Sequence, residues 1–173
     1  MSADHLEPVE RPEADRRRRG RRIVLAWCLV AIWAVVIWTL GGDEFSSAST
    51  SPILLEWLRW LFEDLAPATK YRVLMGLRKS AHFVEYAILA LLAFRAAMLS
   101  ATRNQLATAV LVALFLVATL ATADEARQAF TPSRSGSPYD VLIDISGGLV
   151  ATLGLVVISR RLRGHRSILE ARG

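Results

Sequence analysis

The chain has 173 residues, of which 53% are hydrophobic and 21% are charged, and its formal net charge is +5. The length suits one domain, but the apolar content exceeds that of ordinary soluble proteins and is concentrated in long blocks. In a soluble protein, a net charge of +5 would suggest nucleic acid as a binding partner. Here the arginines gather beside apolar blocks at the two ends of the chain, so we expect no nucleic-acid partner.

Residues 1–22 are polar, carry charges of both signs and show no apolar periodicity, which predicts a disordered basic cytoplasmic tail. Residues 23–40 contain no charged side chain. At about 1.5 Å per residue they nearly match a hydrocarbon core of about 30 Å, so they predict a first transmembrane helix. A signal peptide cleaved near Ser47 is the alternative. It is disfavoured because the apolar run is longer than the usual core of such a peptide.

Residues 52–66 predict an amphipathic helix that is too short and too charged to span the bilayer. Its apolar residues recur at helical spacing, and Pro52 suits the first position of a helix. We expect this helix to lie on the outer membrane surface, anchored by Trp57 and Trp60. A lid packed on the bundle of spans is an alternative that the sequence leaves open.

The second span is predicted over 81–100 and begins with a polar face. Lys79, His82, Glu85 and Tyr86 are three or four residues apart, so a helix places them side by side over about two turns. Arg95 lies near the other end of the span, where its long side chain can reach the interface as a snorkelling anchor.

The third span is predicted over 105–123, and the fourth over 140–159. Asp140 falls in the first turn of the fourth helix, where a carboxylate is favourable. Asp144 lies one turn deeper, and an aspartate at the bilayer centre costs on the order of 3 kcal/mol, so its retention suggests a specific role. Gly147 is a small neighbour that would let another helix approach closely.

These elements predict an all-α fold, an integral membrane bundle of four transmembrane helices plus one outer interfacial amphipathic helix. Seven arginines precede the first span, and five follow the last within a basic cytoplasmic tail over 160–173. By the positive-inside rule both termini are cytoplasmic, and the loops over 41–80 and 124–140 face outward.

This topology brings the polar residues of several segments to one side of the membrane. The second and fourth spans both start at the outer face, so Glu85 and Asp144 are expected at similar depth, facing each other. Ionisable groups inside a membrane are a functional hypothesis by default. We therefore predict a mixed-charge pocket at the outer leaflet, with these ligand-binding candidates: Lys79, His82, Glu85, Tyr86, Asp124, Glu125, Gln128, Arg134, Asp140 and Asp144.

Two motifs in this order carry a family resemblance. RKxxHFxEYAxLAxL begins at Arg78, and DExxQxFxPxRxGSxxDVLxDxxGGxxAxxG begins at Asp124. Together they span 78–154 and resemble the VanZ-like family of small bacterial membrane proteins. The resemblance implies a multi-pass protein of the bacterial cytoplasmic membrane and, for the type member, reduced susceptibility to teicoplanin. Near the position of Asp144 the family commonly has asparagine, whereas this chain has aspartate.

Two functional interpretations remain open, and a binding or structural role is favoured. In it, Arg134 pairs with Glu125 or Asp124, and Lys79 pairs with Glu85. These charges would lock the bundle or bind a cell-envelope component. The expected partners are the lipid bilayer and a lipid-linked or cell-wall ligand, and a homo-oligomer is left open.

In the alternative interpretation the pocket is an enzyme active site for a lipid-linked or phosphorylated envelope substrate. Glu85 or Asp144 would act as the general base and His82 as an acid or base. The sequence has no recognised nucleophile motif or phosphate-binding loop. His82 is the single histidine within the membrane domain, predicted over 23–159, so we expect no metal and no cofactor.

Overall fold

The structure is a computed structural model that describes residues 10–41, 56, 66–102, 105–130 and 137–170. Four long helices make up nearly all of these residues: α1 (Glu10–Leu40), α3 (Pro67–Ser100), α4 (Leu106–Ala129) and α5 (Pro138–Glu170). Each is long and apolar enough to cross a membrane. The prediction of an all-α, four-span membrane protein is confirmed. The interfacial helix expected over 52–66 lies almost entirely outside the described residues.

The helices extend beyond the spans that the apolar runs predict. α1 already begins at Glu10, so residues 10–22 are helical where we expected a disordered tail. Arginine, glutamate and alanine are strong helix formers, which explains why the helix continues outward from the apolar segment. α3 begins at Pro67 rather than at residue 81. Proline suits this place because the first helical residue needs no hydrogen-bond donor.

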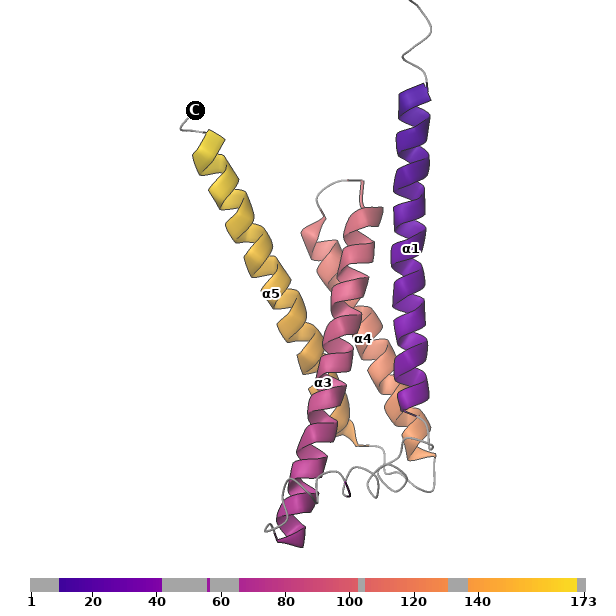
Figure 1. The fold of residues 1–173 in the computed structure, drawn as a ribbon, viewed down its shortest axis with the longest axis vertical. Helices are drawn as coiled ribbons and strands as arrows, with labels where there is room; N and C mark the ends of the chain where they lie inside the picture. The colour runs from indigo at the N-terminus through magenta and orange to yellow at the C-terminus, as the bar shows by residue number, and fades with distance from the viewer. Residues whose placement is uncertain (1–9, 42–55, 57–65, 103–104, 131–136, 171–173) are drawn as a thin grey trace, which may run out of the picture.

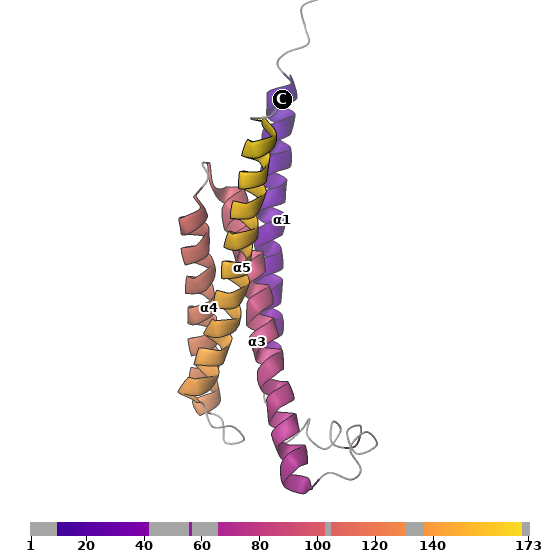
Figure 2. The ribbon, with the colours of Figure 1, turned by 90° about the vertical axis from the view of Figure 1, so that its left-hand side faces the viewer.

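The helix α3 lies at the centre of the bundle and packs against α1, α4 and α5. α5 also packs against α4, but its C-terminal part leans away from the other helices (Figure 1). The first turns of α3 project beyond the other three helices, at the end of the bundle opposite the C-terminal part of α5 (Figure 2). The start of α1 and the end of α5 lie at one end of the molecule, as an even number of crossings requires (Figure 1).

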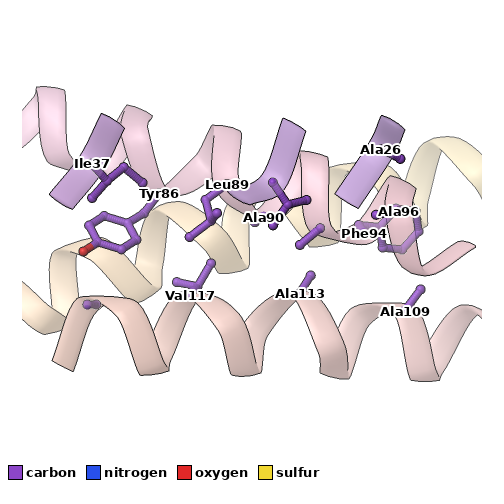
Figure 3. Packing of buried hydrophobic residues seen from close by; sticks show 13 residues of the cluster. Ala26, Ile37, Tyr86, Leu89, Ala90, Phe94, Ala96, Ala109, Ala113 and Val117 are labelled. Carbon is purple, nitrogen blue, oxygen red and sulfur yellow. The ribbon is translucent and has the colours of Figure 1, made fainter. Parts of the chain in front are cut away.

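Small residues form much of the interface between the helices. Ala90 on α3 and Ala113 and Ala121 on α4 are fully buried, and Leu89 and Val117 pack among them (Figure 3). Larger apolar side chains point outward instead. Small residues between helices and large ones at the surface are typical of membrane bundles, since lipid solvates the outer side chains and close backbone approach holds the helices together.

The outward side chains of α4 illustrate the pattern. Leu111 is 67% exposed and Phe115 is 70% exposed, in the middle of a helix without a charged residue between Leu106 and Ala123. Such apolar exposure would be unfavourable in water but is suited to acyl chains. The bundle is therefore organised for a lipid environment.

The length of α3 indicates which of its residues meet the membrane boundary. Its 34 residues span about 50 Å, well over the hydrocarbon thickness of about 30 Å. Counting about 20 residues back from its end at Ser100 reaches the neighbourhood of Lys79 and His82. In α5, a similar count back from Arg160 reaches Asp140. These residues thus lie at comparable depth, near one boundary of the apolar layer.

Candidate functional site: a polar hollow between α3 and α5

A hollow lies between α3 and α5, toward the end of the bundle that is remote from the termini. The α3 side is one helical face, because its four lining residues are three or four positions apart. The α5 side is a matching face at the start of that helix. The lining residues are Met75, Arg78, Lys79, His82, Asp140, Ile143 and Asp144.

Two pairs, each of a basic and an acidic side chain, cross the hollow. The Nζ of Lys79 lies 3.2 Å from Oδ1 of Asp140, and both side chains are substantially exposed. One turn deeper, Nδ1 of His82 lies 3.6 Å from Oδ1 of Asp144. The repeat of one turn on both helices places the pairs one above the other. Lys79, which the sequence suggested as a partner for Glu85, instead pairs with Asp140.

The deeper pair is enclosed. The Asp144 side chain is 2% exposed and that of His82 is 18% exposed. Their separation of 3.6 Å is longer than a hydrogen bond. Neither His82 Nδ1 nor Asp144 Oδ1 has a hydrogen-bond partner among the described residues. A buried polar atom without a partner is uncommon and requires an explanation, such as a ligand-binding or catalytic role.

Arg78 is a lining residue that the sequence analysis did not select. It is half-buried and, among the described residues, has no ion pair with an acidic side chain. Its spacing could have identified it as a site residue, because Arg78 lies four residues before His82 on the same helical face. Its guanidinium adds a positive charge to the hollow. Neither Asp140, which pairs with Lys79, nor Asp144, which faces His82, forms an ion pair with it.

Close contact between α3 and α5 is possible because of a glycine on α5. A Cβ added at Gly147 would collide with the main-chain carbonyl oxygen of Phe83, one residue after His82. At Gly148 the nearest atoms are instead methyl groups of Val117 on α4, at 3.0 Å. The small-residue approach predicted for this part of the fourth span is confirmed. It brings Asp144 within reach of α3.

Asp124 and Gln128 belong to a separate cluster at the end of α4 and do not line the hollow. Asp124 is 1% exposed and accepts bonds from Arg127, at 2.6 Å, and from Gln128, at 2.7 Å. The Arg127 guanidinium also stacks 4.2 Å from the ring centre of Trp38 on α1. A Cβ at Gly41 would lie 2.5 Å from Asp124 Oδ1. This cluster fastens the end of α1 to α4.

Glu125 joins α4 to α5. One of its carboxylate oxygens accepts the backbone N–H of Ser137, at 2.7 Å, immediately before α5 begins. The bond satisfies a free donor at a helix start. The start of α5 is thus fastened to α4 through the N–H of Ser137. Arg134, the expected partner of Glu125 or Asp124, lies outside the described residues.

Glu85 and Tyr86 follow His82 on α3 but are placed differently. The side chain of Glu85 is half-buried and makes no hydrogen bond or ion pair with any described residue, while its main-chain carbonyl accepts the Trp33 indole N–H at 2.9 Å. Tyr86 is fully buried in the core, and its hydroxyl has no partner in the described part of the chain. The residue paired with Asp144 is His82, rather than Glu85.

The hollow combines two chemical capacities. Arg78 and Lys79 supply cationic donors suited to phosphate or carboxylate, and the imidazole backed by a carboxylate is an arrangement that orients a proton donor or acceptor. Within the described ranges, no group of three or more histidine, cysteine or acidic side chains could hold a metal ion. The site is therefore a hollow of mixed charge that combines a half-buried arginine with a buried histidine–carboxylate pair.

Comparison with known proteins identifies one family. A family model described as VanZ/LLP1 matches residues 23–159, which include all four apolar spans and every residue that lines the hollow. No curated protein matches the chain, and no solved structure matches it.

Proposed function

The chain belongs to the VanZ/LLP1 family, and from this premise we propose that it binds an anionic cell-envelope component in the hollow between α3 and α5. As a multi-pass membrane protein it would receive such a ligand from within the bilayer plane. The ligand we propose is a lipid-linked molecule whose phosphate enters the hollow while its chain remains in the membrane. Modulating this component would give the protein a means of altering glycopeptide susceptibility.

The observation that carries this proposal is the charge pattern of the hollow. Asp140 faces Lys79 and Asp144 faces His82, whereas Arg78 has no acidic counterpart among the described residues. A half-buried guanidinium favours a planar or tetrahedral oxyanion as its partner because two of its N–H groups can donate in parallel. Met75 and Ile143 add apolar walls that suit the first carbons of a lipid chain.

The charge distribution along the chain supports an outward-facing site. Seven arginines precede residue 23, and five follow residue 159. The positive-inside rule then assigns the termini to the cytoplasm and the opposite end of the bundle, with the hollow, to the outer face. A site at the outer face is accessible to a lipid-linked envelope component, so the ligand class and the proposed orientation are compatible.

A second candidate function is catalysis on such a substrate. The facing His82 and Asp144 favour it, because a buried carboxylate 3.6 Å from an imidazole would hold the ring in one orientation for proton transfer once the two groups close to hydrogen-bond distance. Arg78 would then neutralise a phosphate during the reaction. Glu85 remains a candidate general base in this alternative. Its half-buried side chain makes no bond with a described residue.

Ligand binding can be tested with a simple amphiphile pair on the purified full-length protein. We expect dodecyl phosphate to raise the thermal midpoint, whereas dodecanol, which lacks the anion, should leave it unchanged. Arg78→Gln should weaken the phosphate effect about tenfold in concentration. Arg72→Gln is the matched control, because Arg72 is exposed on the same helix and does not line the hollow.

An equal response to both amphiphiles, or an unchanged response in Arg78→Gln, would overturn the binding proposal. The catalytic alternative is separated by following the lipid phosphate itself. If Asp144→Asn and His82→Gln still bind the amphiphile while wild-type protein converts a lipid-linked phosphate and the variants do not, catalysis is the function. Wild-type protein that binds but never converts such substrates supports binding alone.

A further inference from the structure

We propose that the crevice between α1 and α3 at the end of the bundle that carries the termini is a binding site for one anionic diacyl phospholipid. The crevice lies toward the opposite end of the bundle from the polar hollow. Its walls combine leucines along its length with an arginine contributed by each helix. None of its lining residues takes part in the proposed envelope function.

The apolar walls have the shape of a chain-binding groove. On α1, Leu25 and Leu29 are four residues apart, and on α3, Leu92 and Leu99 are seven apart, so each pair lies along one helical face. Leu25 and Leu29 are each more than half exposed, at 53% and 52%. An acyl chain lying along this seam would cover both of them.

The two arginines supply the charge for a head group. Arg22 immediately precedes the apolar part of α1, and Arg95 lies on α3 about one and a half turns before that helix ends. Neither forms an ion pair with a described residue. The acidic residue of α3 nearest to Arg95 is Glu85, ten positions or about 15 Å along the helix.

These features favour a phospholipid over simple snorkelling of Arg95. A snorkelling arginine needs only interfacial water, whereas here a second arginine from another helix converges on the same groove. Two guanidinium groups match one phosphate with several charge-assisted hydrogen bonds. Basic pockets between transmembrane helices on the cytoplasmic side are a recognised mode of lipid head-group binding.

The crevice is held in shape by contacts on either side of it. The indole N–H of Trp27 donates to Ser100 Oγ at 3.0 Å, and Arg19 donates to the carbonyl of Ala101 at 2.8 Å. Farther along α1, Trp33 donates to the carbonyl of Glu85. These bonds fix α1 against α3 at both ends of the groove. A lipid would therefore enter a preformed site, which lowers the entropic cost of binding.

Competition between two lipids, read by native mass spectrometry of the full-length protein, tests the proposal. In mixed micelles with equal amounts of phosphatidylglycerol and phosphatidylcholine, we expect one phosphatidylglycerol to be retained preferentially. Arg22→Gln and Arg95→Gln should each reduce this preference about tenfold. Arg21→Gln removes the same charge from the neighbouring exposed position and should retain the wild-type preference.

The groove itself is tested by a variant that keeps both arginines. Leu29→Trp fills the seam and should reduce phosphatidylglycerol retention to the level of the arginine variants, while Val24→Trp, at an exposed position outside the groove, should not. The proposal is overturned if Arg21→Gln loses as much preference as Arg22→Gln, since that would indicate a diffuse basic surface. It is also overturned if Arg95→Gln or Leu29→Trp behaves like wild type.

Discussion

Nδ1 of His82 on α3 faces Oδ1 of Asp144 on α5 at 3.6 Å, at a depth where both side chains are largely shielded. The pair lies one turn below the exposed pair of Lys79 and Asp140. Gly147 makes this arrangement possible, because it lets α5 approach the main chain of α3 at Phe83. Packing and chemistry at the hollow therefore depend on the same helix crossing.

The first prediction concerns the coupling of this pair. His82→Leu leaves the Asp144 carboxylate buried without its facing partner, so we expect the free energy of unfolding to fall by about 1–3 kcal/mol. In the double variant His82→Leu/Asp144→Leu both polar groups are gone, and the total loss should be smaller than the sum of the two single losses. Unfolding titrations in mixed micelles measure all three values. Strictly additive losses would show that the two side chains do not interact.

The second prediction concerns the helix crossing. Gly147→Ala introduces a Cβ that collides with the carbonyl of Phe83, and we expect a loss of about 1–3 kcal/mol in the free energy of unfolding. Gly154→Ala is the matched control on the same helix, since nothing lies within 4 Å of its added Cβ. There alanine should be neutral or stabilising by up to about 1 kcal/mol. Equal effects at both glycines would contradict the close approach.

The third prediction contrasts a buried ion pair with an exposed one. Asp124 is 1% exposed, so Arg127→Ala removes the cation paired with a buried carboxylate that also accepts a bond from Gln128, and should cost about 3 kcal/mol. Lys79→Ala breaks the pair with Asp140, whose side chains are 51% and 35% exposed, and should cost about 0–1 kcal/mol. The comparison uses thermal and denaturant unfolding of the two variants. A larger loss for Lys79→Ala would contradict the difference in burial.

The spans could be predicted from the sequence because each rests on a long apolar run, a property that needs no tertiary information. Asp144 could also be identified as a candidate site residue from local pattern, since a carboxylate one turn inside an apolar run is energetically costly whichever way it faces. Gly147 likewise signalled a close helix approach. These features depend on composition and helical spacing alone.

The partners of the charged residues could not be predicted in the same way. We placed the end of the third span at residue 123, so Asp124 was expected in a turn, whereas α4 continues to Ala129 and brings Arg127 beside it at helical spacing. The pairing of Lys79 with Asp140 depends on the register between two helices far apart in sequence. Helical register across an interface is set by packing, and one turn of slippage would exchange the partners.

The last prediction concerns the side of the membrane that the hollow faces. Tyr139, at the start of α5, is 74% exposed, and Arg160 is exposed near the opposite boundary. Cys28 is exposed and is replaced by serine in both variants so that a single thiol remains. We expect a membrane-impermeant maleimide to label Tyr139→Cys in intact cells and Arg160→Cys only after lysis, because the basic termini should remain cytoplasmic. The reverse pattern would invert the topology and place the hollow within reach of a cytoplasmic ligand, ruling out an outward-facing envelope site.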